Sequence, residues 1–280
     1  MGDWVNIHFH VKPTLVDESF LKRMDDCFAA VKYRPAPGWI LHSRDDKAIP
    51  SSDRLAAMDE ANFWQPHGSG SPDDWMTAAT LAYSPTGELE PNIFHIWLQI
   101  YKEARYVSSI TLKTHVTSFY FRPECVIEED DSEEVKENTR ICLAKAEIIR
   151  KIVPIIHEKF GAYRTGALTD AGRLLELSQV KETILPFWDG KENDTFPLYE
   201  TVSGKWMCPV CCEAHFEKPP CFMSANPQTP WAEPSFQKCP TCQTQFGVDD
   251  NLRTFPEINQ GSLWSKLQRK WLKRKQISPP

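Results

Sequence analysis

Long apolar runs are missing from this chain of 280 residues, although hydrophobic residues make up 41% of it. No stretch approaches the roughly 18 to 20 consecutive apolar residues of a transmembrane helix, so we expect no membrane span. The amino terminus also lacks the apolar segment of a secretory signal peptide. Nine cysteines without such a signal indicate a reducing compartment, and we therefore expect a cytoplasmic protein.

Common catalytic fingerprints are missing too. The chain contains no nucleophile-elbow motif G-x-S-x-G, no phosphate-binding P-loop and no dinucleotide-binding glycine motif. It also shows no internal repeat. The sequence gives no indication of catalysis, and we expect a non-enzymatic protein.

Acidic residues outnumber basic ones in most of the chain, which carries a formal net charge of −6. Residues 251–280 carry +6, so the preceding 250 residues carry −12. Nucleic-acid-binding domains gain affinity by neutralising phosphates. The acidic body therefore disfavours a protein that binds nucleic acid with the whole domain.

The first half of the chain has the patterning of an α+β fold. Strands are indicated by alternating apolar and polar residues or by runs rich in Val, Ile, Thr and aromatics, and helices by apolar residues three or four apart. These patterns predict strands over 5–11, 39–42, 76–83, 92–101 and 106–120, a helix over 17–31, a turn at 35–38 and a short helix around 54–63. Short connections between the last three strands favour an antiparallel meander.

A long helix is predicted from Ser132 to Phe160. Ser132 can cap it, acidic residues occupy its first turn, and Pro154 is expected to kink it. Residues 161–196 show no clear pattern and receive no assignment. The expected buried stripe of the helix consists of Val135, Ile141, Leu143, Ile148, Ile149, Ile152, Ile155 and Ile156.

Two cysteine pairs, Cys208-Pro209-Val210-Cys211 and Cys239-Pro240-Thr241-Cys242, lie 27 residues apart. Each pair can present two sulfurs to one metal, and four thiolates complete the tetrahedral coordination of Zn²⁺. A redox pair or a disulfide framework fits less well, because the surroundings are irregular and rich in proline and the chain lacks a secretion signal. We expect one structural Zn²⁺ in a zinc ribbon, with iron as an alternative because thiolates also bind it.

Further motifs accompany the pairs: Glu217-Lys218-Pro219-Pro220, Pro234-Ser235-Phe236 before the second pair, and Phe246-Gly247-Val248-Asp249-Asp250 after it. In these features residues 208–250 resemble the small cysteine-rich CPCC-type zinc domain of bacterial proteins, which is similar to modules found in immunity proteins of polymorphic-toxin systems. Glycine usually follows the second cysteine of such a pair, whereas here Cys212 and Gln243 take those places and must tolerate the turn geometry. Cys212, Cys221 and His215 are further potential ligands.

Acidic residues concentrate at the start of the long predicted helix. The ordinary interpretation is a solvated helix start that the helix dipole stabilises. The alternative is a docking face that steers a basic partner. The candidate partner-binding residues are Glu128, Glu129, Asp130, Asp131, Glu133 and Glu134.

His8 and His10 share one face of the first predicted strand and could bind a metal in a hydrolase, although two histidines on the polar face of a sheet are the simpler interpretation. Residues 263–275 predict a basic amphipathic helix. It could contact nucleic acid or an anionic membrane. The favoured interpretation is that it docks Leu263, Trp264 and Trp271 on the acidic body.

These observations predict an α+β domain over residues 1–196, with a mostly antiparallel sheet packed by helices. A zinc ribbon is expected over 197–250 and a basic helix over 251–280. The resemblance implies an immunity protein that binds and occludes a cognate protein toxin, such as a nuclease effector of a type VI secretion system. The alternatives are a zinc-ribbon protein associated with nucleic acid and a metal-dependent hydrolase.

Overall fold

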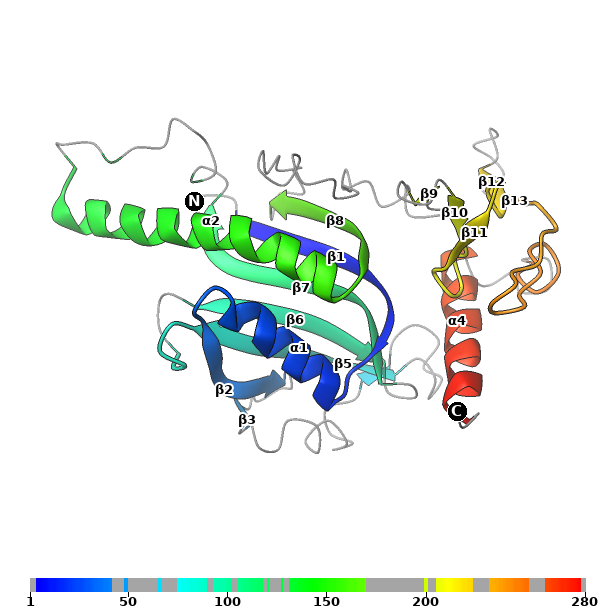
Figure 1. Cartoon of the computed structure of the whole chain (residues 1–280), viewed down its shortest axis with the longest axis horizontal. Helices are drawn as coiled ribbons and strands as arrows, with labels where there is room; N and C mark the ends of the chain where they lie inside the picture. Colours follow the sequence, from blue (N-terminus) through cyan, green and yellow to red (C-terminus); the bar gives the residue numbers. More distant parts are fainter. Residues whose placement is uncertain are drawn as a thin grey trace. The chain divides into compact units, whose positions relative to one another are not determined.

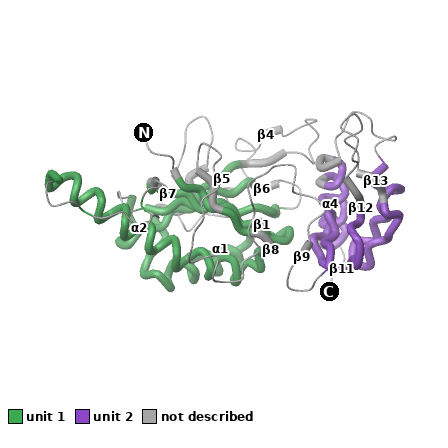
Figure 2. Tube along the Cα trace, turned by 90° about the horizontal axis from the view of Figure 1, so that it is seen from above, with its two compact units in different colours: residues 1–190 green, residues 191–280 purple. Residues whose placement is uncertain are grey.

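An eight-stranded sheet forms the centre of residues 1–190, one of the two compact units into which the chain divides (Figure 2). The structure is a computed structural model. It describes residues 4–41, 48–49, 65–66, 75–89, 93–101, 105–117, 120, 127, 131–169, 199–200, 205–223, 232–251 and 260–277. None of the helices described is long and apolar enough to cross a membrane.

The strands run in the order β3-β2-β5-β6-β7-β1-β8, with β4 paired to β5, and their pairings are antiparallel. Their bounds are β1 Trp4–Leu15, β2 Arg34–Leu41, β3 Ala48–Ile49, β4 Gln65–Pro66, β5 Trp75–Ser84, β6 Phe94–Tyr101, β7 Tyr106–Thr117 and β8 Ala162–Thr169. The predicted meander is confirmed as β5-β6-β7. The predicted α+β fold class is also confirmed.

Two helices, α1 Glu18–Ala29 and α2 Glu133–Lys159, cover one face of this sheet (Figure 1). Asp17 caps α1 by accepting a hydrogen bond of 2.8 Å from the backbone N–H of Phe20. Ser132 caps α2 in the same way, at 3.3 Å from the nitrogen of Val135. Both helices thus begin where a side-chain acceptor satisfies an otherwise unpaired N–H group, and the cap at Ser132 is the one that the sequence predicted.

The core lies between the helices and the sheet. From α2 it receives Ile149, Ile152 and Ile156, each with no measurable exposure. Phe28 of α1 stacks on Tyr83 of β5 with ring centroids 3.9 Å apart. Burying one such side chain contributes about 1.5 to 3 kcal/mol, so this apolar layer is the main force that holds the helices on the sheet.

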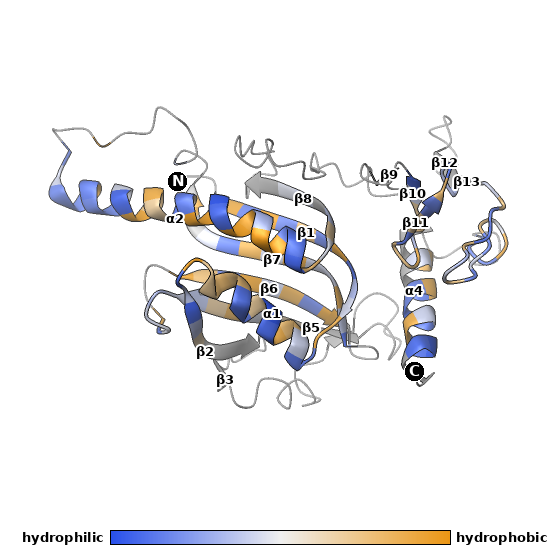
Figure 3. Ribbon diagram, in the orientation of Figure 1, coloured by the Kyte–Doolittle hydropathy of each residue, from blue (hydrophilic) through white to orange (hydrophobic). Residues whose placement is uncertain are grey.

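The amino-terminal half of α2 extends beyond the edge of the sheet and is mostly hydrophilic (Figures 1 and 3). Val135, which we expected in the buried stripe, is 47% exposed there, so this part of the prediction is wrong. Ile141 and Leu143 are half-buried. The stripe is therefore buried only where α2 lies over the sheet. Pro154 lies inside the helix, which continues to Lys159.

Three other expectations differ from the structure. The turn at 35–38 is wrong, because β2 continues through it with a register shift between Ala36 and Trp39. The first strand continues past residue 11 to Leu15, again with a register shift. Residues 162–169, which received no assignment, form β8 beside β1. The short helix expected around 54–63 lies outside the described residues.

The second unit, residues 191–280, contains two small sheets and a helix. The sheets have the orders β11-β10-β9 and β12-β13. The bounds are β9 Tyr199–Glu200, β10 Lys205–Met207, β11 Ala214–Phe216, β12 Cys221–Met223, β13 Ala232–Pro234 and α4 Gln260–Ile277. Both cysteine pairs and the basic helix therefore belong to one compact unit.

Candidate metal centre

Each cysteine pair lies in the loop of a short hairpin, closed by the pair Met207 and Ala214 in the first and by Lys238 and Gln245 in the second. The same two backbone hydrogen bonds fold both loops. They are Cys212 N to Cys208 O at 2.8 Å and Cys208 N to Glu213 O at 2.9 Å, and correspondingly Gln243 N to Cys239 O at 3.0 Å and Cys239 N to Thr244 O at 2.9 Å. Two equivalent turns therefore present two sulfurs each.

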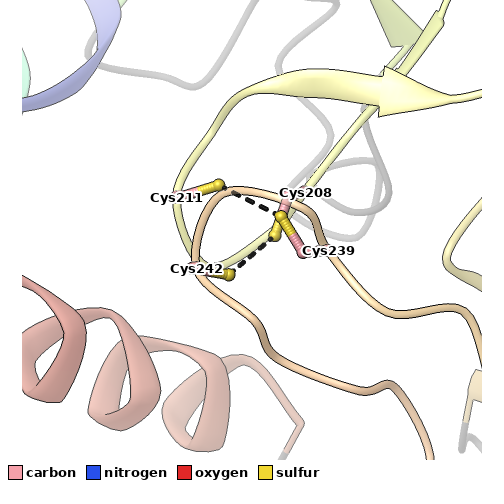
Figure 4. A group of neighbouring side chains, drawn as sticks. All are labelled: Cys208, Cys211, Cys239 and Cys242. Atoms are coloured by element: carbon pink, nitrogen blue, oxygen red, sulfur yellow. Dashed lines mark hydrogen bonds between the residues drawn. The ribbon is translucent and has the colours of Figure 1, made fainter.

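The four sulfurs of these turns point toward one another (Figure 4). Cys208 Sγ lies 3.7 Å from Cys242 Sγ, and Cys211 Sγ lies 3.6 Å from Cys239 Sγ. All four sulfurs lie within 4.8 Å of one another. A tetrahedron with metal–sulfur bonds of about 2.3 Å has sulfur–sulfur edges of about 3.8 Å. The separations therefore suit a single tetrahedral ion, and the buried group can hold one.

The four neighbouring thiols differ in pKa. Hydrogen bonds from Cys208 and Cys211 lower the pKa of Cys239 to about 7 and also lower the pKa of Cys242. The pKa of Cys208 is raised, chiefly through its hydrogen bond with Cys211. Some thiols therefore stay protonated, because four adjacent negative charges would repel one another. A bound cation would replace those protons and compensate the charge.

Helix α4 lies beside the cluster and belongs to its hydrophobic surroundings. Trp264 is buried among the cysteines, and Leu267 and Trp271 pack on them in part. Trp264 Nε1 donates a hydrogen bond of 2.7 Å to Asp250 Oδ2, and Gln268 Nε2 donates one of 3.0 Å to the carbonyl of Val210. Since Val210 lies between Cys208 and Cys211, α4 supports the first turn directly.

Two of the further potential ligands, Cys212 and His215, do not join the cluster. Cys212 is buried, but its sulfur lies 3.7 Å from Gln268 Nε2. His215 Nε2 lies 2.6 Å from Thr241 Oγ1. The side chain of Cys221 is outside the described residues. The geometry thus selects the four cysteines that the spacing had indicated.

His8 and His10 lie on the face of β1 opposite the buried Ile7 and Phe9. His8 Nδ1 is 3.1 Å from Thr111 Oγ1, and burial, together with the charge of Lys113, lowers the pKa of His8 to about 4. Among the described residues, the four cysteines form the only group of three or more His, Cys, Asp or Glu side chains close enough to bind one ion. The hydrolase alternative therefore gains no support from the residues that the structure describes.

The acidic run is described only in part. Glu128, Glu129 and Asp130 lie outside the described residues, and Asp131 is half-buried. Glu133 and Glu134 are exposed in the first turn of α2. Glu133 also forms an ion pair of 3.4 Å with Lys136, which neutralises part of the run. The docking role of these carboxylates stays a prediction.

Sequence reasoning missed the contacts that α4 makes with the cysteine turns. The basic amphipathic pattern located the helix, but no pattern indicated that Gln268 would bond to a turn carbonyl.

Searches with the chain find no matching family model, no matching curated protein and no matching solved structure.

Proposed function

We propose that the four cysteines hold one structural Zn²⁺ and that the chain is a non-enzymatic binding protein whose second unit depends on that ion. The sulfur–sulfur distances of 3.6 and 3.7 Å carry the proposal. Four buried thiolates leave no ligand position for water or substrate, which favours a structural role for the ion over a catalytic one.

The small core of the second unit supports this role. Among the described residues of this unit the buried cluster has eight members, and four of them are the cysteines themselves: the cluster consists of Cys208, Val210, Cys211, Phe216, Cys239, Cys242, Phe246 and Trp264. So few apolar side chains bury little surface. A structural Zn²⁺ supplies folding free energy to a domain of this kind.

Elemental analysis of the purified protein tests this proposal. We expect one zinc per chain, and we expect Cys208→Ser to lose it. Cys212→Ser is the matched control, because this neighbouring buried sulfur lies by Gln268 and should leave the metal content unchanged. One iron per chain would replace zinc in the proposal, whereas no metal, or full retention in Cys208→Ser, would reject it.

For the biological role, we propose an immunity protein that binds and occludes a cognate protein toxin. The resemblance of residues 208–250 to CPCC-type zinc domains supports this role. The exposed carboxylates at the start of α2 add a surface that would attract a basic toxin and speed its association. A toxin that acts on nucleic acid would have a basic active site, because it must bind phosphate groups.

Co-expression with the product of the adjacent open reading frame tests the role. We expect that product alone to stop growth and this chain to restore growth by forming a complex. Glu133→Lys with Glu134→Lys should slow association about tenfold at low salt. Glu88→Lys with Glu158→Lys, at two other exposed positions, should not. A harmless neighbouring product, or toxicity that this chain does not relieve, would contradict the proposal.

A further inference from the structure

The inner face of α4 is used for packing within the second unit. Trp264 is 5% exposed, Leu267 and Trp271 pack on the cysteine cluster, and Gln268 bonds to the turn at Val210. These contacts fix which way the helix faces relative to the two cysteine turns. They consequently also fix which side chains of α4 lie away from the cysteine turns.

Part of the remaining circumference of α4 is strongly cationic. Helix α4 contains six basic residues and no acidic one. At about 100° per residue, five of them fall within roughly 140° of the helix circumference, away from Trp264 and Trp271. The five are Lys266, Arg269, Lys270, Lys273 and Arg274. We call them the cationic face of α4.

Within the cationic face, Lys266, Lys270 and Arg274 are exposed, whereas Lys273 is half-buried and Arg269 is buried, with 8% exposed. The three exposed residues are four residues apart, so they follow one another at about 6 Å along the helix axis. This row of positive charges suits a partner that carries a row of negative charges.

The packing of α4 disfavours a membrane as the partner. A helix that binds a bilayer surface inserts its apolar face among the lipids. Trp264 of α4 belongs to the cysteine cluster instead and is 5% exposed, Leu267 and Trp271 pack against that cluster, and Leu263 is also buried, with 1% exposed. Membrane insertion would require this core to open.

A protein partner also fits less well than a nucleic acid. Protein interfaces are enriched in aromatic residues and depleted of lysine, particularly at their centres. The exposed residues of the cationic face are lysines and an arginine, which bind phosphate as point charges or through paired N–H groups. Phosphate groups, regularly spaced along a strand, match this composition.

We propose that the cationic face of α4 binds the phosphate backbone of a nucleic acid without reading its sequence. The cysteine turns hold the helix in place, and the long basic side chains make the contacts. This binding site lies in a different unit from the acidic start of α2, so it goes beyond the proposed immunity role and does not depend on it.

Fluorescence anisotropy with labelled DNA and RNA oligonucleotides, single-stranded and duplex, tests the proposal on the full chain. We expect affinity to fall steeply as salt rises from about 50 to about 200 mM. The triple variant K266Q/K270Q/R274Q should bind at least about tenfold more weakly. The slope of log affinity against log salt should shrink by about 2 to 3, since each lost phosphate contact removes about 0.9.

Two controls separate phosphate binding by the cationic face of α4 from a general effect of lost charge or lost folding. K22Q/K32Q/K151Q removes the same charge from exposed positions of the first unit and should leave affinity and slope nearly unchanged. Metal content and helix signal should be the same in both variants. No salt-dependent binding by the unmodified chain, equal losses in both triple variants, or binding to anionic phosphatidylserine vesicles in place of every oligonucleotide would overturn the proposal.

Discussion

Among the described residues of the second unit, three that are not glycine hold a left-handed backbone conformation, which residues with a side chain rarely adopt. Cys212 has φ of 58° and Gln243 has φ of 63°. At these two places the turn requires the conformation, because both residues donate the backbone hydrogen bond that closes a cysteine loop. The third, Phe236, has φ of 58° although its side chain is 63% exposed.

Phe236 should therefore be a site where substitution stabilises the second unit. The left-handed conformation costs a bulky residue about 1 to 2 kcal/mol, whereas asparagine tolerates it. We expect Phe236→Asn to increase the free energy of unfolding by about 0.5 to 1 kcal/mol in denaturant titrations. Phe236→Ala, which removes the same ring without this benefit, should give no gain. Equal destabilisation by both would show that the ring packs on the protein.

His8 should make the first unit sensitive to acid. Its pKa is about 4 in the folded protein and about 6.5 when unfolded. Between these values only the unfolded chain binds the proton, so stability is complete above pH 6.5 and falls as the pH decreases toward 4. The loss reaches about 1.4 kcal/mol per pH unit from this group.

Urea titrations of the protein and of His8→Gln between about pH 7 and pH 4 measure this effect. The difference in free energy of unfolding between the two proteins should change across that window, because other titrating groups, including the half-buried His157, are present in both. His10→Gln is the control at the neighbouring position on the same face. Parallel pH profiles for the unmodified protein and His8→Gln would contradict the assignment.

Among the elements, those specified by local sequence were the ones that could be predicted. Asp17 and Ser132 mark the starts of α1 and α2 through hydrogen bonds within one turn. The cysteine turns were equally local, since two intervening residues and a proline define each of them. Their meeting across 27 residues followed from the coordination that a metal requires.

Elements that depend on distant pairing could not be predicted in this way. Strand β8 contains Gly166 and has no regular alternation of apolar and polar residues. Its conformation comes from pairing with β1, where Gly166 lies opposite His8, more than 150 residues away in sequence. β2 likewise continues through Pro37 and Gly38 because its pairing with β5 resumes after a register shift. At this place, pairing with the neighbouring strand overrides the local preference of Pro and Gly for a turn.

Helix α4 should depend on a polar contact as much as on its apolar face. Trp264→Phe keeps most of the buried ring but removes the donor to Asp250, whose carboxylate is 5% exposed. A hydrogen bond to a charged group contributes about 1.5 to 3 kcal/mol, and we expect a loss of this size in the unfolding of the second unit.

Trp271→Phe provides the matched comparison for this prediction. Trp271 packs on the same cluster and lies under the ammonium group of Lys275, 4.6 Å from its ring centroid. A cation–π contact at an exposed site contributes about 0.5 to 1 kcal/mol, so Trp271→Phe should cost less than Trp264→Phe. The reverse order would mean that apolar area, and not the bond to Asp250, holds α4 in place.

At the scale of the whole molecule, the two units have cores of different kinds. The first combines helices α1 and α2 with the large sheet, and its buried cluster is almost entirely aliphatic and aromatic. In the described part of the second, the buried cluster is small, and the four cysteines that could hold a metal are half of its members. Stability should consequently respond to metal in one unit and to apolar packing in the other.

Removal of the metal should therefore abolish one unfolding transition and keep the other. Without the ion, the cysteine turns lose their coordination, and α4 loses the surface on which Trp264 packs. A helix of 18 residues is marginal on its own in water, so its circular dichroism signal should fall with the metal. Calorimetry after treatment with a strong chelator should show that the transition of residues 1–190 persists. Added Zn²⁺ should restore the second transition, whereas loss of both transitions, or of neither, would contradict a metal that stabilises only the second unit.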